Sequence, residues 1–184
     1  MEKCWALQIN KYLEDNFYLK DNHQGGVKGR GTVTSTLNLN SKINKIINNK
    51  KIAAVIGLDQ SSCFDIIDHS ILLEKLDYIG FNPQTCSLIK DFLRDTKQYT
   101  EINSNFSDLL CVGNQSIFQG SVLSVIFYNI YCMDIPYVPH NLPSSLQHNS
   151  HYEYYNCNQP FLLSYIDDLF AIIEGEKDNI CNKI

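Results

Sequence analysis

The chain has 184 residues, of which 44% are apolar and 19% charged, and its formal net charge is −5. This composition supports a packed domain and excludes a disordered protein, and no apolar run reaches the roughly 20 residues that cross a bilayer. The charge is uneven, because residues 1–52 hold nine Lys and Arg against four Asp and Glu, whereas residues 53–184 hold six against sixteen. We therefore expect a basic part that can meet phosphates and an acidic part that can hold cations.

The cysteines and the N-terminus indicate an intracellular protein. Seven cysteines occur without a CxxC pair, and the first ten residues contain no signal-like apolar block. We expect the cysteines to be reduced, buried thiols, so that no disulfide-linked partner is predicted.

Two helical patterns flank a glycine-rich loop in the first part of the chain. Apolar residues recur at helical spacing over 3–19 and again over 37–47. Between them, NHQGGVKGRGT at 22–32 predicts a basic loop. The apolar run KIAAVIGLD at 51–59 then predicts a buried strand that ends on a carboxylate, Asp59.

The middle of the chain predicts helices and a hairpin. Residues 68–80 favour a helix that ends at a glycine, and residues 82–95 favour one that begins with an Asn cap and a proline. The segments KQYTEIN and SDLLCV predict a β-hairpin that turns at SNF, residues 104–106. Ser121 is expected to cap a helix that runs to about Met133.

The segment FLLSYIDDLFAII at 161–173 places two adjacent carboxylates inside an apolar run. It follows residues 136–160, whose composition predicts a long loop or insertion, and it predicts two strands joined by a turn at Asp167 and Asp168. Buried carboxylates are costly unless they are paired or bind a metal. If this hairpin neighbours the strand that ends at Asp59, three carboxylates meet at one sheet edge. Such a cluster suits two Mg²⁺ ions and phosphoryl transfer to a nucleotide.

Four segments then follow one another in a familiar order. They are NHQGGVKGRGTVTSTL, AAVIGLDQSSCFDIIDH, SIFQGSVLSVIFYNIYCMDIP and the YIDD box. They resemble, in turn, the fingers segment and motifs A, B and C of reverse transcriptases, and FLRDTKQYTEIN is similar to a segment of the non-LTR (LINE-type) retrotransposon branch. The resemblance covers essentially the whole chain, and four motifs in order are far more specific than YxDD alone.

The resemblance implies an α+β fold and a polymerase activity. The expected fold is a right-hand polymerase palm over 53–184, with an antiparallel sheet packed on helices, preceded by a partial fingers region over 1–52 and without a thumb. The implied activity is RNA-directed DNA synthesis with two Mg²⁺ ions, or Mn²⁺. The implied partners are an RNA template, a DNA primer and dNTPs. No membrane partner is expected, because the chain has no apolar run long enough to cross a bilayer.

The resemblance also implies roles for individual residues. Asp59 and Asp167 would ligate the catalytic metals, with Asp168 as the accompanying carboxylate. The other implied residues would bind the nucleotide: Phe64 as a gate beneath the sugar, Gln119 and Gly120 as the pocket lining, and Lys28 and Arg30 as partners of phosphates. Taken singly, each has a plainer interpretation, such as a solvated turn for the aspartates, a core aromatic for Phe64 or a solvated basic loop.

Some features depart from the family pattern. Phe118 replaces the usual proline of motif B, Ser124-Val125 replaces Gly-Pro, and the chain ends 16 residues after Asp168. We therefore expect a fragment with little activity alone. The alternatives are a non-catalytic remnant, or a group II intron-like reverse transcriptase, since FDIIDH is shared with that branch.

Overall fold

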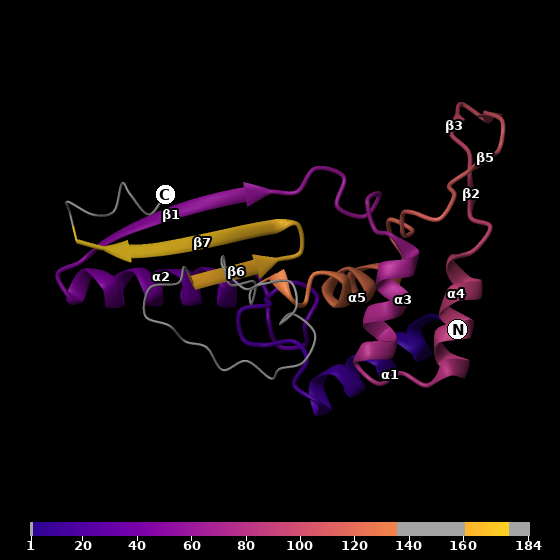
Figure 1. The fold of residues 1–184 in the computed structure, drawn as a ribbon. Coiled ribbons are helices and arrows are strands. Elements are labelled where there is room, and N and C mark those ends of the chain that lie inside the picture. The colour runs from indigo at the N-terminus through magenta and orange to yellow at the C-terminus, as the bar shows by residue number, and fades with distance from the viewer. Residues whose placement is uncertain (1, 136–160, 177–184) are drawn as a thin grey trace. The chain divides into compact units, whose positions relative to one another are not determined.

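The computed structural model describes residues 2–135 and 161–176, which form two compact units (Figure 1). The helical unit combines Met1–Tyr12 with Ser62–Tyr131, and the sheet unit combines Leu13–Ser61 with Cys132–Ile184. The loop expected at 136–160 lies outside the described residues. The fold is thus a mixed α+β fold, as expected.

The sheet unit contains a three-stranded antiparallel sheet in the order β1-β7-β6. Its strands are β1 (Ile52–Asp59), β6 (Phe161–Tyr165) and β7 (Asp168–Gly175). Helix α2 (Thr32–Asn48) runs along the sheet in Figure 1 and contacts both β1 and β6. The buried apolar side chains of this unit come from the helices and from β6 and β7, and they include Leu13, Ile46, Leu163, Ala171 and Ile172.

The prediction that residues 51–59 form a buried strand is wrong in its burial. β1 is an edge strand of the described sheet, and Ile52, Val55 and Leu58 are exposed. A continuous apolar run is typical of a strand that is buried on both faces. An antiparallel edge strand, however, has a single neighbouring strand and can face water.

The helical unit is built from α1 (Glu2–Asp15, whose last residues belong to the sheet unit), α3 (His69–Tyr78), α4 (Pro83–Leu93) and α5 (Val122–Tyr131). Helix α5 is apolar nearly all round and is the most buried of them, as expected for a helix at the centre of a core. Its fully buried side chains include Leu123, Phe127 and Ile130.

The predicted helix ends are confirmed where local chemistry sets them. The Asp68 carboxylate accepts hydrogen bonds from the backbone N–H groups of Ser70 and Ile71, and so caps α3. Gly80, directly after the C-cap residue Ile79 of this helix, has φ +90, which a glycine adopts without steric cost. Asn82 caps α4 through the N–H of Thr85 at 2.8 Å.

The hairpin after α4 exists, but its predicted turn is wrong. β2 (Lys97–Gln98) pairs with β5 (Leu110–Cys111), and β3 (Glu101–Ile102) pairs with β4 (Asn105–Phe106). The turn is Asn103–Ser104, with φ of 49 and 64, which is the two-residue geometry that suits the twist of a hairpin. The third residue assigned to the turn from the sequence, Phe106, therefore belongs to a strand and packs on Tyr99.

The cysteines in the described part of the chain are all free thiols. Cys63 is buried as expected, whereas Cys4 and Cys111 are exposed, so the expectation that the cysteines are core residues fails for these two. None of the described helices combines the length and the apolar character that a membrane crossing requires.

Burial of His23 makes the stability of the sheet unit depend on pH. His23 is 2% exposed, and burial, helped by the nearby Arg30, lowers its pKa from 6.5 to about 4. Between these two values the unfolded chain binds a proton that the folded chain does not. The free energy of unfolding therefore loses nothing to this titration above pH 6.5, and it falls as the pH drops towards 4. The loss is at most about 3 kcal/mol.

We predict that His23→Gln flattens this dependence. Between about pH 7 and pH 4.5, the unfolding temperature of the wild type should fall more than that of His23→Gln, because only the wild type carries the buried imidazole. Equal pH slopes for the two proteins would contradict the role of His23.

Candidate active site

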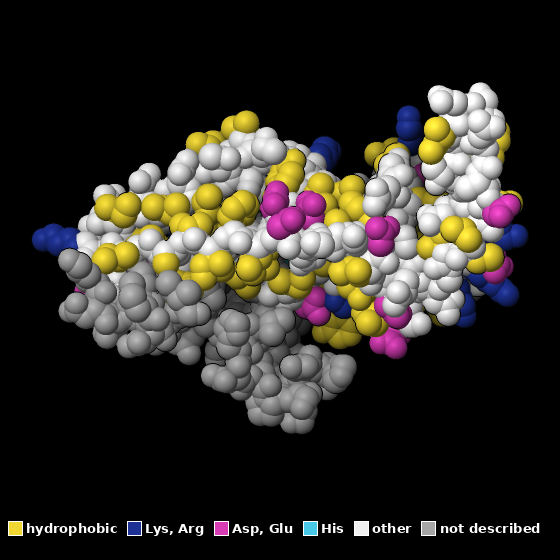
Figure 2. Space-filling model, turned by 90° about the horizontal axis from the view of Figure 1, so that it is seen from above, with side chains coloured by type: hydrophobic (Ala, Val, Ile, Leu, Met, Phe, Trp, Pro, Cys, Tyr) yellow, Lys and Arg dark blue, Asp and Glu magenta, His cyan; other side chains and the backbone are white. Residues whose placement is uncertain are grey.

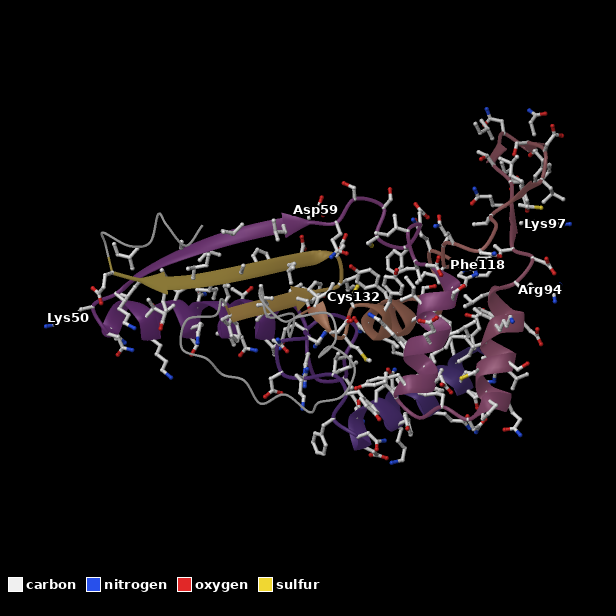
Figure 3. The ribbon with its side chains drawn as sticks, viewed as in Figure 1. Lys50, Asp59, Arg94, Lys97, Phe118 and Cys132 are labelled. Carbon is white, nitrogen blue, oxygen red and sulfur yellow. The ribbon has the colours of Figure 1, made fainter. Side chains whose placement is uncertain are left out.

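Two carboxylates face each other across neighbouring strands of the sheet unit. β1 and β7 pair so that Asp59, the last residue of β1, lies opposite Asp168, the first residue of β7. Directly opposed residues of an antiparallel pair have Cβ atoms about 4.5–5.5 Å apart and point to the same face of the sheet. Figure 3 shows Asp59 at the end of β1, beside the turn between β6 and β7. The two strands thus bring together carboxylates that lie 109 residues apart in sequence.

The third carboxylate lies in the turn itself. Tyr165 pairs with Asp168, which leaves Ile166 and Asp167 as the two turn residues. The turn predicted at Asp167 and Asp168 is therefore wrong by one residue, because pairing with Tyr165 makes Asp168 the first residue of β7. Ile166 has φ 53, a left-handed conformation that is a genuine outlier for a β-branched residue. Asp59 and Asp168 are exposed, whereas Asp167 is half-buried. Acidic side chains gather at this end of the sheet in Figure 2.

The carboxylates at this end of the sheet suit Mg²⁺ better than a metal ion that needs a complete set of protein ligands. Within residues 2–135 and 161–176, no group of three or more His, Cys, Asp or Glu side chains is arranged to enclose a metal ion. Mg²⁺ does not require such an enclosure, because it keeps several waters and binds through one or two carboxylates together with substrate phosphates. The opposed pair Asp59–Asp168 supplies those carboxylates at an exposed sheet edge.

The basic loop of the sheet unit uses its two cations differently. Lys28 is exposed, whereas the Arg30 side chain is 22% exposed and binds its own loop. The Arg30 guanidinium donates to the backbone oxygens of Lys20 and His23 and to the Asp21 carboxylate at 3.2 Å. A phosphate role for Arg30 would require it to give up these bonds.

Phe64, Gln119 and Gly120 belong to the helical unit. The ring of Phe64 packs on Tyr128 with 5.5 Å between centroids, and the Phe64 carbonyl accepts from the N–H of Ile117 at 2.9 Å. Gln119 and Gly120 are exposed, and Gly120 has φ +98 with open space where a Cβ would lie. Backbone conformation, and not crowding, therefore accounts for this glycine.

The departures in motif B have local structural roles. The hydroxyl of Ser124 donates to the backbone oxygen of Phe118, and the Ser121 hydroxyl accepts from the N–H of Leu123 at 3.1 Å. Phe118 packs edge-on against Phe92, 5.9 Å away. The two hydroxyl groups thus tie the loop before α5 to the start of that helix, and the Phe118 ring ties it to α4.

The chain belongs to the reverse transcriptase (RNA-dependent DNA polymerase) family, whose sequence model matches residues 2–183. Enzymes of this family bind nucleic acid and generally use divalent metals. No curated protein matches the chain.

Solved structures with a similar fold include telomerases. An apo telomerase from Candida tropicalis, truncated from its C-terminal domain, matches 99% of this chain with a TM-score of 0.60 and 15% identity. A telomerase from the same organism in complex with a fragment of telomeric RNA matches 97% with a TM-score of 0.64 and 15% identity. The chain spans 36% and 29% of those two chains. At this identity the likeness concerns the fold alone.

One residue beside the carboxylates was not predicted from the sequence. A Cβ on Gly25, in the basic loop, would lie 2.5 Å from a side-chain carbon of Ile166 in the turn. The signal was available in the pair Gly25–Gly26, but a glycine pair in a loop does not show which of its members is crowded.

The facing carboxylates should destabilise the protein when no cation is present, because like charges directly opposite on neighbouring strands repel. We predict that Asp168→Asn raises the unfolding temperature in metal-free buffer by about 1–3 °C. Adding MgCl₂ should stabilise the wild type and so reduce the difference in unfolding temperature between the wild type and Asp168→Asn.

The matched control is Asp108→Asn, which changes an exposed aspartate of the hairpin in the helical unit. It should leave the unfolding temperature unchanged with and without MgCl₂. An equal rise in both variants would show that net charge, and not the Asp59–Asp168 pair, is responsible.

Proposed function

We propose that this chain carries the active site of an RNA-directed DNA polymerase, with Asp59, Asp167 and Asp168 as its metal-binding carboxylates. The observation that carries the proposal is the register that sets Asp59 opposite Asp168 at the end of β1. Membership of the reverse transcriptase family supports the same assignment. The plainer interpretation is a solvated turn. It does not explain why Asp59, from a distant segment, lies opposite Asp168, the residue that follows this turn.

The proposed reaction is attack of a primer 3′-OH on the α-phosphate of a dNTP, with release of pyrophosphate. Bound Mg²⁺ would supply neutralisation of phosphate charge and activation of the attacking hydroxyl. Asp59 and Asp167 hold the metals in this proposal, and Asp168 adds a carboxylate to the same edge. The exposed position of the pair leaves room for the triphosphate that completes the coordination.

Residues outside the carboxylate cluster are proposed to handle the substrates. Lys28, which is exposed on the basic loop, is proposed to contact phosphates of the nucleotide or template, as is Arg30 when it leaves its loop partners. Phe64 is proposed as the gate that excludes a ribose 2′-OH, with Gln119 and Gly120 lining the nucleotide pocket.

The finer classification rests on sequence segments. We propose that residues 1–52 are fingers-like and that 53–184 form a palm. The segment FLRDTKQYTEIN favours the non-LTR retrotransposon branch over the group II intron-like branch.

We predict that substitution of the carboxylates abolishes synthesis. Asp59→Asn and Asp167→Asn should each lower primer extension on an RNA template by at least about 100-fold in Mg²⁺ or Mn²⁺, because each removes a metal ligand. The assay is incorporation of a labelled dNTP, with Asp108→Asn as the control that should extend like the wild type. Extension unaffected by Asp59→Asn or Asp167→Asn would refute the metal assignment.

A binding measurement separates an active site from a non-catalytic remnant. In the presence of Mn²⁺, a dNTP at 100 times its Kd should stabilise the wild type by about 2.7 kcal/mol and should not stabilise Asp59→Asn. A wild type that gains no stability from Mn²⁺ and dNTP would favour the remnant.

We predict that Phe64→Val relaxes sugar discrimination. A smaller side chain should raise kcat/KM for ribonucleotides relative to deoxyribonucleotides by roughly tenfold or more, because the gate loses its bulk. Phe106→Val, which truncates an exposed aromatic of the hairpin, should leave the ratio unchanged. An unchanged ratio in Phe64→Val would make Phe64 a packing partner of Tyr128 only.

A further inference from the structure

We infer that Gly25 is a positioning residue for the turn Ile166–Asp167, which directly precedes Asp168. Its backbone lies directly against the turn, at a separation that no side chain permits, and it thereby fixes where the turn sits on the sheet. The inference concerns the place of the turn, and its consequence for synthesis rests on the proposed function of the carboxylates.

The contact between Gly25 and the turn is closer than side-chain packing. A Cβ built on Gly25 would lie 2.5 Å from Ile166 Cγ1, 2.6 Å from the Ile166 backbone nitrogen and 3.1 Å from the Tyr165 carbonyl carbon. Two of these three atoms are backbone atoms, which cannot rotate away as the end of a side chain can. A methyl group on residue 25 must therefore displace the turn or the loop.

The loop is fixed to the strand that leads into the turn. The backbone N–H of Ser164 donates to the Asn22 carbonyl at 2.9 Å, and the N–H of Gln24 donates to the Ser164 carbonyl at 2.8 Å. His23 and Ser164 form a parallel β-bridge between these two bonds. Ser164 is two residues before Ile166, so the loop is registered on β6 immediately beside the point of contact.

The loop is also held from its other side. Arg30 donates to the backbone oxygens of Lys20 and His23, and Gln24, which is 2% exposed, donates through Nε2 to the Asp21 carbonyl at 2.5 Å. The Gln24 Oε1 accepts from the Thr34 hydroxyl at 2.8 Å, which connects the loop to α2. A loop held by so many bonds resists displacement, so an added methyl group should move the turn.

The turn has a conformation that its own sequence does not favour. Ile166 is a β-branched residue at φ 53, and such a conformation is strained and persists only where the surroundings impose it. Gly25 contacts this residue directly. When Ile166 moves, Asp167 moves with it, and a misplacement of about 1 Å at a reacting centre can cost roughly 100-fold in rate.

The experiment compares Gly25→Ala with Gly31→Ala in the full 184-residue chain. Gly31 is a matched control because it lies in the same loop, has an extended backbone with φ −171 and has nothing within 4 Å of an added Cβ. The first measurement is the amide chemical shifts of residues 165–168 in ¹⁵N-labelled protein. The second is primer extension with kcat and KM for the dNTP determined separately, together with thermal unfolding.

The expected result is a displaced turn with impaired chemistry. Gly25→Ala should shift the amides of residues 165–168 and lower kcat by about 10–100-fold with little change in KM, while remaining folded at the assay temperature. Gly31→Ala, which changes the N-cap of α2, can lower the unfolding temperature, but it should match the wild type in the amide shifts of residues 165–168, in kcat and in KM. Fluorescence or circular dichroism of Gly25→Ala would show whether it is folded, and amide shifts confined to the turn would separate displacement from unfolding.

Other results would overturn the inference. Unshifted amides in Gly25→Ala would show that Gly25 does not place the turn, whatever the activity. Shifted amides with an unchanged kcat would show that the position of the turn is not important for synthesis. If the wild type itself shows no Asp59-dependent extension, the proposed function fails, while the amide shifts still decide whether Gly25 positions the turn.

Discussion

The pairing of β1 with β7 is the constraint on which the rest of the sheet unit depends. All eight residues of β1 have a partner on β7, from Ile52 opposite Gly175 to Asp59 opposite Asp168. Because side chains alternate between faces, a slip of one residue would reverse the faces of the whole strand. The same register therefore sets which side chains meet α2 and which carboxylates face each other.

The carboxylate end of the sheet combines features that are individually unfavourable. Two like charges lie directly opposite each other, and Ile166 in the adjoining turn is left-handed. Such unfavourable features are typical of functional sites, where the surrounding structure holds them in place. Here the surroundings are the loop residues Asn22 to Gly25, which bond to Ser164 and pack against the turn. Arg30 donates hydrogen bonds to the backbone of this loop and so holds it in place. The arginine that is proposed to bind phosphates therefore also stabilises the loop.

Local chemistry made much of the fold predictable from the sequence. The cap at Asn82 and the glycine after α3 were predicted correctly because each acts on the few residues next to it. The turn of the hairpin was misplaced because an aromatic was assigned to the loop, whereas Asn103 and Ser104 adopt the positive φ that a two-residue turn needs. The exposure of β1, Cys4 and Cys111 was not predictable in this way, since it depends on neighbours that are distant in the chain.

The sequence alone determined the identity and order of the chemical groups: a basic glycine-rich loop between two helices, a strand that ends in Asp59 and a hairpin that carries two adjacent aspartates. These follow from short-range periodicity and from turn and cap preferences, which act within a few residues. Only the tertiary structure decided that Asp168 is the residue opposite Asp59, that Arg30 binds its own loop and that Gly25 touches the turn. Strand register and close packing join segments that are far apart in sequence, and no local preference encodes which atoms meet.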